Sequence, residues 1–171
     1  PYGSVTYDVT TKDPKMPTAA TYSVSPAGVD VISQGSPVFE FTGNTSTGGH
    51  QGVVSAYDEE VIIQENTWED YNYIPVLAYN SDSTAVVADN RFTDVGYYAL
   101  YCSGMAMEIE DLVIEGSRPY TTTTTYYDKS GKEIVSEESS YHNFQFVASG
   151  CDTEVNGAEF SGTGYTAMYI S

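Results

Sequence analysis

The sequence has few of the residues that usually mark a catalytic, metal-binding or nucleic-acid-binding protein. Its 171 residues include two cysteines, one tryptophan, two histidines and six Lys or Arg. These six bases face 24 acids, which gives a net charge of −18. Phosphate binding needs clustered Lys and Arg, so we expect neither nucleic acid nor an anionic membrane surface as a partner.

Long apolar runs and helical periodicity are also missing. The longer apolar runs, such as Tyr97 to Cys102, fall far short of the ~20 residues that span a bilayer, so we expect no membrane insertion. No window repeats apolar residues at the spacing of an amphipathic helix. This pattern argues against an α-helical fold.

The sequence instead contains many short stretches in which apolar and polar residues alternate. Val5, Tyr7 and Val9 share one face of such a stretch, and Phe39 and Phe41 share another. Turn-forming residues separate the stretches, roughly every eight to twelve residues, which is typical of a sandwich or barrel. We therefore predict an all-β, antiparallel β-sandwich, immunoglobulin-like or jelly-roll-like, with roughly ten to thirteen strands.

We expect residues 1–171 to form a single domain, with no internal repeat. A boundary near Gly116–Pro119 is the alternative. Residues 1–11 hold an isolated alternating strand before a proline-bearing spacer. This strand either pairs within its own domain or extends to a neighbouring chain.

Three places in the sequence predict β-hairpins. Residues 97–102 and 105–114 alternate on either side of Ser103-Gly104, and Asp111 interrupts the second alternation, which suggests a bulge. Asn156-Gly157 is a strong two-residue hairpin signal. The run from Tyr120 to Tyr127 contains five consecutive threonines. Because threonine is β-branched, we predict a strand there, returning after a turn at Gly131, rather than a linker.

Cys102 and Cys151 belong to no CxxC motif, so a zinc site is not expected. One disulfide in an oxidising compartment is the preferred interpretation, and two buried free thiols are the alternative. The disulfide would close a loop of about 50 residues and contribute on the order of 4 kcal/mol. It predicts a secreted or cell-surface protein.

The segment "DVGYYAL", Asp94 to Leu100, resembles the Asp-x-Gly-x-Tyr-x-Leu pattern of immunoglobulin-like domains. The resemblance covers seven residues. It implies that Tyr98 is a tyrosine-corner residue whose hydroxyl bonds to nearby backbone. In disulfide-bearing members of the family a cysteine stands where this chain has Leu100, and no cysteine precedes Trp68 here. The resemblance therefore supports a sandwich and little more.

Nothing local in the sequence points to catalysis. His50 lies among small polar residues and His142 lies in an expected strand, and neither belongs to an HExxH motif. No GxSxG elbow is present. We expect no catalytic residues and no enzyme; a secreted hydrolase with clustered carboxylates is a third possibility, after the two functions given below.

The segment "ENTWEDYNY" is the candidate ligand-binding site. Trp68, Tyr71 and Tyr73 lie there beside Glu69 and Asp70. Aromatic rings with flanking carboxylates suit sugar rings, and they equally suit a protein partner. The alternative is that Trp68 fills the core at the end of a strand.

Two further kinds of site are weaker candidates. Calcium is the only cofactor considered, with oxygen ligands from two acidic segments, although the EF-hand spacing is absent. The acids concerned are Asp58, Glu59, Glu60, Asp82 and Asp89. Asn44-Thr45-Ser46 is an N-glycosylation sequon, if the source glycosylates.

The sequence thus suggests an extracellular structural or adhesive surface protein, whose partners are itself or other surface proteins. It could be a pilus-like filament subunit that assembles when the N-terminal strand adds to a neighbour's sheet. The alternative function is a carbohydrate-binding module that binds glycans through Trp68.

Overall fold

The structure is a computed structural model that describes residues 3–8, 19–24, 28–117, 120–127, 130–141, 144–162 and 166–171. The chain divides into two compact units. One unit comprises Gly28–Tyr120 and His142–Ser171, and the other comprises Pro1–Ala27 and Thr121–Tyr141. Within the described ranges, no helix is long and apolar enough to span a membrane.

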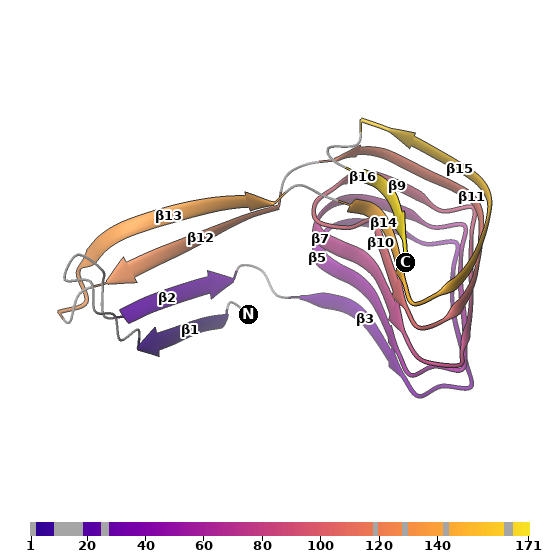
Figure 1. Cartoon of the computed structure of the whole chain (residues 1–171), viewed down its shortest axis with the longest axis horizontal. Coiled ribbons are helices and arrows are strands. Elements are labelled where there is room, and N and C mark those ends of the chain that lie inside the picture. Colours follow the sequence, from indigo (N-terminus) through magenta and orange to yellow (C-terminus); the bar gives the residue numbers. More distant parts are fainter. Residues whose placement is uncertain are drawn as a thin grey trace. The chain divides into compact units, whose positions relative to one another are not determined.

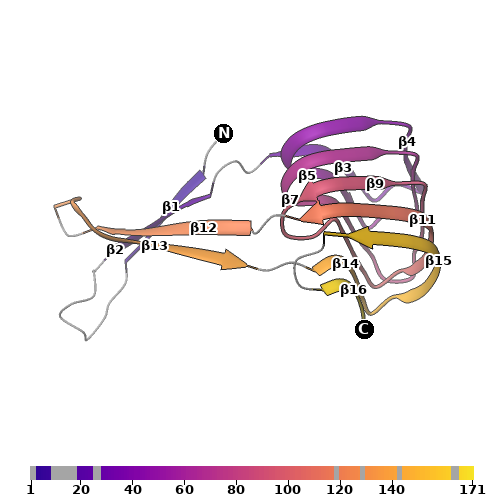
Figure 2. The same ribbon diagram turned by 90° about the horizontal axis from the view of Figure 1, so that it is seen from above.

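The larger unit is a parallel β-solenoid of about five turns, so the prediction of an antiparallel β-sandwich is wrong. Figures 1 and 2 show its strands stacked turn upon turn. The strands are β3 (Val29–Gln34), β4 (Val38–Thr42), β5 (Thr45–Ala56), β6 (Glu60–Gln64), β7 (Thr67–Tyr79), β8 (Thr84–Ala88), β9 (Arg91–Val95), β10 (Leu100–Ser103), β11 (Ala106–Ser117), β14 (Phe144–Ser149), β15 (Asp152–Ser161) and β16 (Thr166–Ile170).

Three parallel sheets form the sides of the solenoid. Sheet 1 contains β3, the second halves of β5 and β7, and then β10, β14 and β16. Sheet 2 contains β4, β6, β8 and the first halves of β11 and β15. Sheet 3 contains the first halves of β5 and β7, then β9, and the second halves of β11 and β15.

The strand register reveals a regular repeat, so the expectation of no internal repeat is wrong. One turn of the coil carries the chain from Val38 to its partner Glu60, and a later turn of equal length carries it from Thr84 to Ala106. The intervening turn is two residues longer, because Glu60 pairs with Thr84. Ala106 pairs with Asp152, so the turn between them is far longer and contains an insertion.

The repeat is clearest at the corners, where the backbone takes positive φ. Gly43, Glu65, Asp89, Asp111 and Gly157 occupy the corner between sheets 2 and 3, with φ of 71, 57, 54, 46 and 83°. Gly48, Asp70, Asp94, Gly116 and Gly162 occupy the corner between sheets 3 and 1, each five residues later. Glycine has no Cβ to oppose this conformation, and aspartate tolerates it. Because the two corners lie five residues apart, the part of each turn that belongs to sheet 3 is short.

Three asparagines form a ladder inside the corner between sheets 2 and 3. The Asn66 side-chain oxygen accepts from the Asn44 backbone N–H at 3.0 Å. Its Nδ2 donates to the Phe41 carbonyl and to Asn90 Oδ1, both at 3.0 Å. Asn90 Nδ2 then donates to the Ile63 carbonyl at 2.7 Å. The ladder satisfies carbonyl groups that the turning backbone would otherwise leave buried and unpaired.

The core of the solenoid is a continuous apolar column. The Trp68 ring stacks on Phe92 at 6.1 Å and on Phe41 at 5.5 Å between ring centroids. Gly52 makes room for the indole, because a Cβ there would meet the ring at 2.5 Å. Farther along the coil, Ile114 is fully buried. Stacked turns thus bury side chains that no single turn could cover.

Two predicted hairpins are wrong for the same reason. β10 and β11 belong to different sheets, and each pairs in parallel with strands of neighbouring turns. At Asn156-Gly157 the chain turns a corner within β15 and continues forward. The interruption at Asp111 is likewise a corner, with φ of 46°. The seven residues that resemble an immunoglobulin-like strand span the corner between β9 and β10.

The smaller unit is a four-stranded sheet in the order β1-β2-β12-β13. Its strands are β1 (Gly3–Asp8), β2 (Ala19–Val24), β12 (Tyr120–Tyr127) and β13 (Glu133–Tyr141). β2 pairs antiparallel with both β1 and β12. The predicted strand through the threonine run is confirmed, and β13 lies beside it in the sheet. β1 pairs within its own chain; Val9, which was grouped with it, lies outside the described residues.

Candidate functional site: the open ends and the neutral sheet

The first turn of the solenoid leaves three strand edges open. Among the described strands, β3 pairs only with β5, and β4 pairs only with β6. The first half of β5 pairs only with β7. Each of these strands therefore has one edge whose backbone N–H and C=O groups meet no described strand, which is a template for another strand.

A polar cluster lies at this first end. The Tyr71 hydroxyl donates to Asp30 Oδ2 at 2.5 Å and also lies 2.5 Å from Ser46 Oγ. Burial, followed by the bond to the Asp30 carboxylate, raises the pKa of Tyr71 to about 12. Gly49 gives the ring its space, because a Cβ there would lie 2.7 Å from it. The protonated Tyr71 hydroxyl therefore makes hydrogen bonds at this end of the core. The edges of β3, β4 and the first half of β5 still have no described partner strand.

The last turn leaves an apolar edge. β16 pairs only with β14 among the described strands. Ser171 donates to the Ala148 carbonyl and accepts from the Gly150 N–H, so its backbone faces β14. Because backbone groups alternate along a strand, those of Met168 and Ile170 face the open edge. Their side chains are 40% and 46% exposed, although they continue the inward-facing rows of sheet 1.

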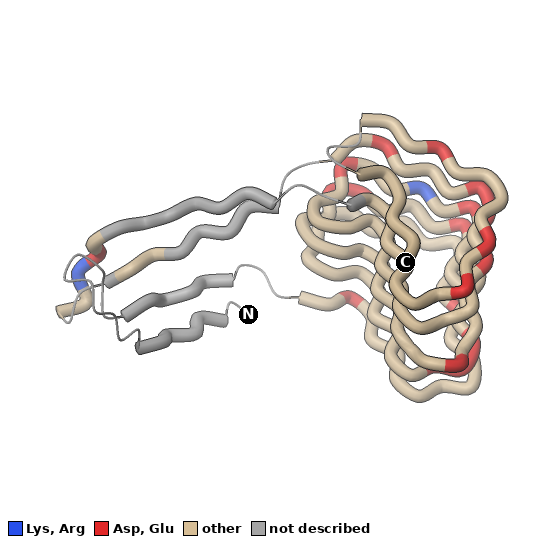
Figure 3. Tube along the Cα trace, viewed as in Figure 1, with Lys and Arg blue, Asp and Glu red and all other residues tan. Residues whose placement is uncertain are grey.

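Charge is distributed unevenly over the three sheets. The strands of sheet 1 contain one acid, Asp30, and no Lys or Arg. Corner residues aside, the strands of sheets 2 and 3 contain nine acids and one base. They are Glu40, Glu60, Glu69, Glu108, Glu110, Glu115, Asp152, Glu154 and Glu159, with Arg91. Figure 3 shows the acids gathered away from β10, β14 and β16.

Sheet 1 carries a row of apolar side chains on its outer face. Register places the row in six successive strands. Its members are Ile32, Val54, Leu77, Tyr101, Val147 and Tyr169. Ile32 is 65% exposed and Tyr169 is 47% exposed, whereas Val147 is only 6% exposed. The row is uncharged from the first turn to the last.

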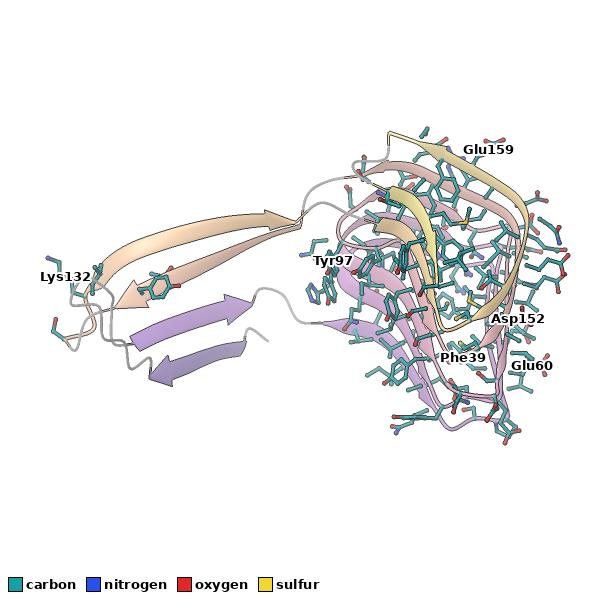
Figure 4. The ribbon with its side chains drawn as sticks, viewed as in Figure 1. Phe39, Glu60, Tyr97, Lys132, Asp152 and Glu159 are labelled. Atoms are coloured by element: carbon teal, nitrogen blue, oxygen red, sulfur yellow. The ribbon has the colours of Figure 1, made fainter. Side chains whose placement is uncertain are left out.

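Aromatic rings border this neutral sheet. The His50 ring stacks on Tyr73 at 4.6 Å, and Tyr73 stacks on Tyr97 at 5.3 Å. His50 Nδ1 also lies 2.9 Å from Asn72 Oδ1. Figure 4 shows Tyr97 on the side of the solenoid opposite Glu60 and Asp152. The stacked rings cover one another's faces, so they present edges and hydroxyls rather than flat platforms.

A groove of about 530 Å³ crosses the outer face of sheet 2. Outward carboxylates of Glu108, Asp152 and Glu154 line it, together with Thr84 and Val86. It belongs to the charged side of the molecule.

The predicted binding segment forms part of β7 instead of a loop. Trp68 and Tyr71 are buried, with 1% and 0% exposure. Glu69 is exposed on the outer face, and Asp70 forms a corner with φ of 58°. Tyr73 lies in the aromatic border. The five residues do not converge on one surface, and the indole has no exposed face with which to stack on a sugar ring.

The predicted disulfide is wrong. Cys102 and Cys151 are free thiols, and they do not lie at disulfide distance. Burial raises the pKa of the Cys102 thiol well above its usual range, which keeps it protonated and unreactive. The Cys151 thiol lies 3.6 Å from the Ser149 carbonyl oxygen. The extracellular expectation rested mainly on this disulfide and loses that support.

The acids considered for calcium are used by the fold or dispersed. Asp58 is fully buried and accepts from the Ser36 backbone N–H at 2.7 Å and from Ser55 Oγ at 2.6 Å. Asp82 and Asp89 lie at separate turns, with φ of 67 and 54°. In the described part of the chain, no three His, Cys, Asp or Glu side chains are arranged to hold a metal ion.

The sequon asparagine belongs to the ladder. Asn44 Nδ2 donates to the Thr42 carbonyl at 3.0 Å and lies 3.3 Å from Asn66 Oδ1. A glycan on this nitrogen would leave it one N–H, so it could keep only one of the two contacts. His142 lies outside the described residues.

Comparison of the chain with models of protein families, with curated proteins and with solved structures found no match. Its functional surfaces are therefore inferred from geometry alone. No motif in the sequence marks the residues of the open edge and the neutral row. One signal was present, because Val53-Val54 and Val76-Leu77 are apolar on both faces of a strand.

Proposed function

We propose that this chain is a non-enzymatic structural protein whose solenoids stack end to end into a filament. The observation that carries the proposal is the open, apolar edge at Met168 and Ile170. Exposed apolar strand edges promote pairing with another chain. Filament assembly by strand addition is retained from the sequence, but the adding strand is now β16 and not the N-terminal strand.

The opposite end of a second copy suits this edge. A solenoid repeats by translation along its axis, so β3 and β16 run in the same direction within sheet 1. A copy shifted along the axis would place its β3 beside β16 in parallel, as every neighbouring pair in the sheet already lies. Such a contact is heterologous and does not close, so it generates a filament rather than a dimer.

The side chains at the two ends support the same pairing. Val155 and Phe160 of the last described turn are only partly buried, and no described strand pairs with the outer edge of β15. Phe39 and Phe41 of the first turn are likewise partly buried. Stacking would join these two apolar surfaces into one core and remove both from water.

Replacement of Ile170 by proline tests the proposal. Proline removes the one N–H of Ile170, which faces the open edge, without removing a bond to β14. Ile170→Val keeps the N–H and serves as the matched control. We expect wild type and Ile170→Val to form filaments in electron micrographs, and Ile170→Pro to form none while its circular dichroism spectrum stays unchanged.

A second pair of variants distinguishes a lost contact between copies from misfolding of the last turn. Met168→Lys places a charge at the same edge, and Thr84→Lys places one on an outer face midway along the coil. We expect only Met168→Lys to prevent assembly. A wild-type chain that stays monomeric at every concentration and salt level would refute the proposal.

A further inference from the structure

The neutral outer face of sheet 1 has no role in end-to-end stacking, since it runs parallel to the axis. We propose that this face binds the same face of a second copy, so that two filaments associate side by side. The inference deepens the proposed function and rests on it for its biological setting. The contact between two neutral faces can nevertheless be measured on its own.

The charge distribution favours a second copy of this chain as the partner that binds the outer face of sheet 1. Two chains of net charge −18 repel one another wherever their acids face each other. Sheet 1 is the only side of the solenoid whose described strands carry no acid beyond Asp30 at the first turn. Two copies can therefore approach closely through this face, and through the other faces only at a large electrostatic cost.

The side chains of the face have the composition of an interface. Val54, Leu77 and Tyr101 lie in adjacent strands and point away from the core, since none belongs to the buried apolar cluster. Tyr57 and Tyr79 border the row, with ring centroids 5.6 Å apart. Tyrosine and aliphatic side chains without charge are typical of the centre of a protein interface.

The size of the face explains why it would act only in a filament. Val147 of β14 is only 6% exposed, so the other five strands, about 4.8 Å apart and roughly five residues long, give about 400 Å² per copy. A stable pair of proteins needs about 800 Å² on each partner. A single pair of chains would thus associate weakly, whereas a filament repeats the contact at every subunit and gains avidity.

The inference is tested on chains that cannot stack. In the Ile170→Pro background, we expect sedimentation equilibrium to show weak, concentration-dependent dimers. Leu77→Glu in that background introduces facing carboxylates and should weaken the dimer about tenfold or more. Val86→Glu is the matched control, because Val86 is a partly buried, outward residue of sheet 2. Val54→Thr, which is nearly isosteric, replaces Leu77→Glu if that variant unfolds.

Electron microscopy of stacking-competent chains gives the second measurement. Wild-type filaments should be paired, and Leu77→Glu filaments should be single and equally long. The inference is overturned if Ile170→Pro chains show no dimers at any concentration, or if Val86→Glu weakens them as much as Leu77→Glu does. Absence of filaments would refute the proposed stacking instead, and the sedimentation result would still decide the lateral contact.

Discussion

At the scale of single residues, the corner between sheets 2 and 3 shows how different residue types meet one conformational need. Gly43 and Gly157 adopt positive φ without strain, whereas Glu65 adopts φ of 57° with a Cβ in place. A non-glycine residue in this region costs about 1–2 kcal/mol. Glutamate at this corner therefore carries strain that its glycine neighbours in the column avoid.

Exchange of glycine and glutamate along this corner measures the strain. We expect Glu65→Gly to raise the free energy of unfolding by about 0.5–1 kcal/mol, since relief of strain exceeds the added chain entropy. The reverse change, Gly43→Glu, should lower it by about 1–2 kcal/mol. Chemical denaturation of both variants checks the pair. A loss of stability in Glu65→Gly would show that the glutamate side chain has a stabilising contact.

The asparagine ladder makes a second prediction about single residues. Asn66 is 1% exposed, and its amide bonds both the Phe41 carbonyl and Asn90. Asn66→Leu would leave the Phe41 carbonyl without this donor and the Asn44 N–H without its acceptor, whereas Asn90 Oδ1 would still accept from the backbone N–H of residue 66. We expect a cost of about 2–4 kcal/mol. Thr47→Leu, on the exposed outer face of sheet 3, should change stability little. Thermal denaturation distinguishes the two, and equal effects would contradict the role of the ladder.

The sequence marks Asn156-Gly157 as a turn but does not show which kind of turn it forms. Asn156-Gly157 favours positive φ whether the chain reverses in a hairpin or turns through one corner of a coil. The choice between the two depends on which strand lies alongside, which local sequence does not encode. The buried state of Trp68 was similarly left open, because a tryptophan flanked by acids suits either a corner strand or an exposed loop.

At the scale of elements, the position of strands was more predictable than their partners. Alternation correctly placed a strand around Phe39 and Phe41, because period two follows from strand geometry itself. The β-branched threonines correctly placed the strand at 120–127. Alternation does not indicate whether neighbouring strands run parallel or antiparallel. Sheet 1 offered a hint, since its strands are apolar on both faces, a pattern more common in parallel sheets.

The insertion between β11 and β14 provides a prediction at this scale. Removal of residues 118–141 would give the turn from Ala106 to Asp152 the same length as the turn from Thr84 to Ala106. We expect the shortened solenoid to keep its circular dichroism spectrum and its melting temperature within a few degrees. The N-terminal strands β1 and β2, of which β2 pairs with β12, should then become sensitive to protease. Unfolding of the whole shortened chain would show that the insertion is part of the solenoid core.

At the scale of the whole molecule, the repeat is not visible in the sequence, because the backbone conformation repeats from turn to turn while the residue types differ. Glycine, glutamate and aspartate occupy one corner column, and asparagine gives way to leucine and alanine in the column beside it. The insertion between β11 and β14 also breaks the period. Only the register of the folded strands brings these different residues into one series.

Net charge gives the last prediction, because stacking brings together chains that each carry −18. The screening length falls from about 30 Å at 0.01 M salt to about 8 Å at 0.15 M. As salt rises, repulsion between acids of neighbouring copies therefore weakens, while the stabilisation from burying apolar edges does not. We expect the concentration needed for filament formation to fall as salt rises, as measured by light scattering. Glu154→Gln with Glu159→Gln, in the exposed last turn, should reduce this salt dependence. Assembly that weakens with added salt would instead indicate that ion pairs hold the copies together.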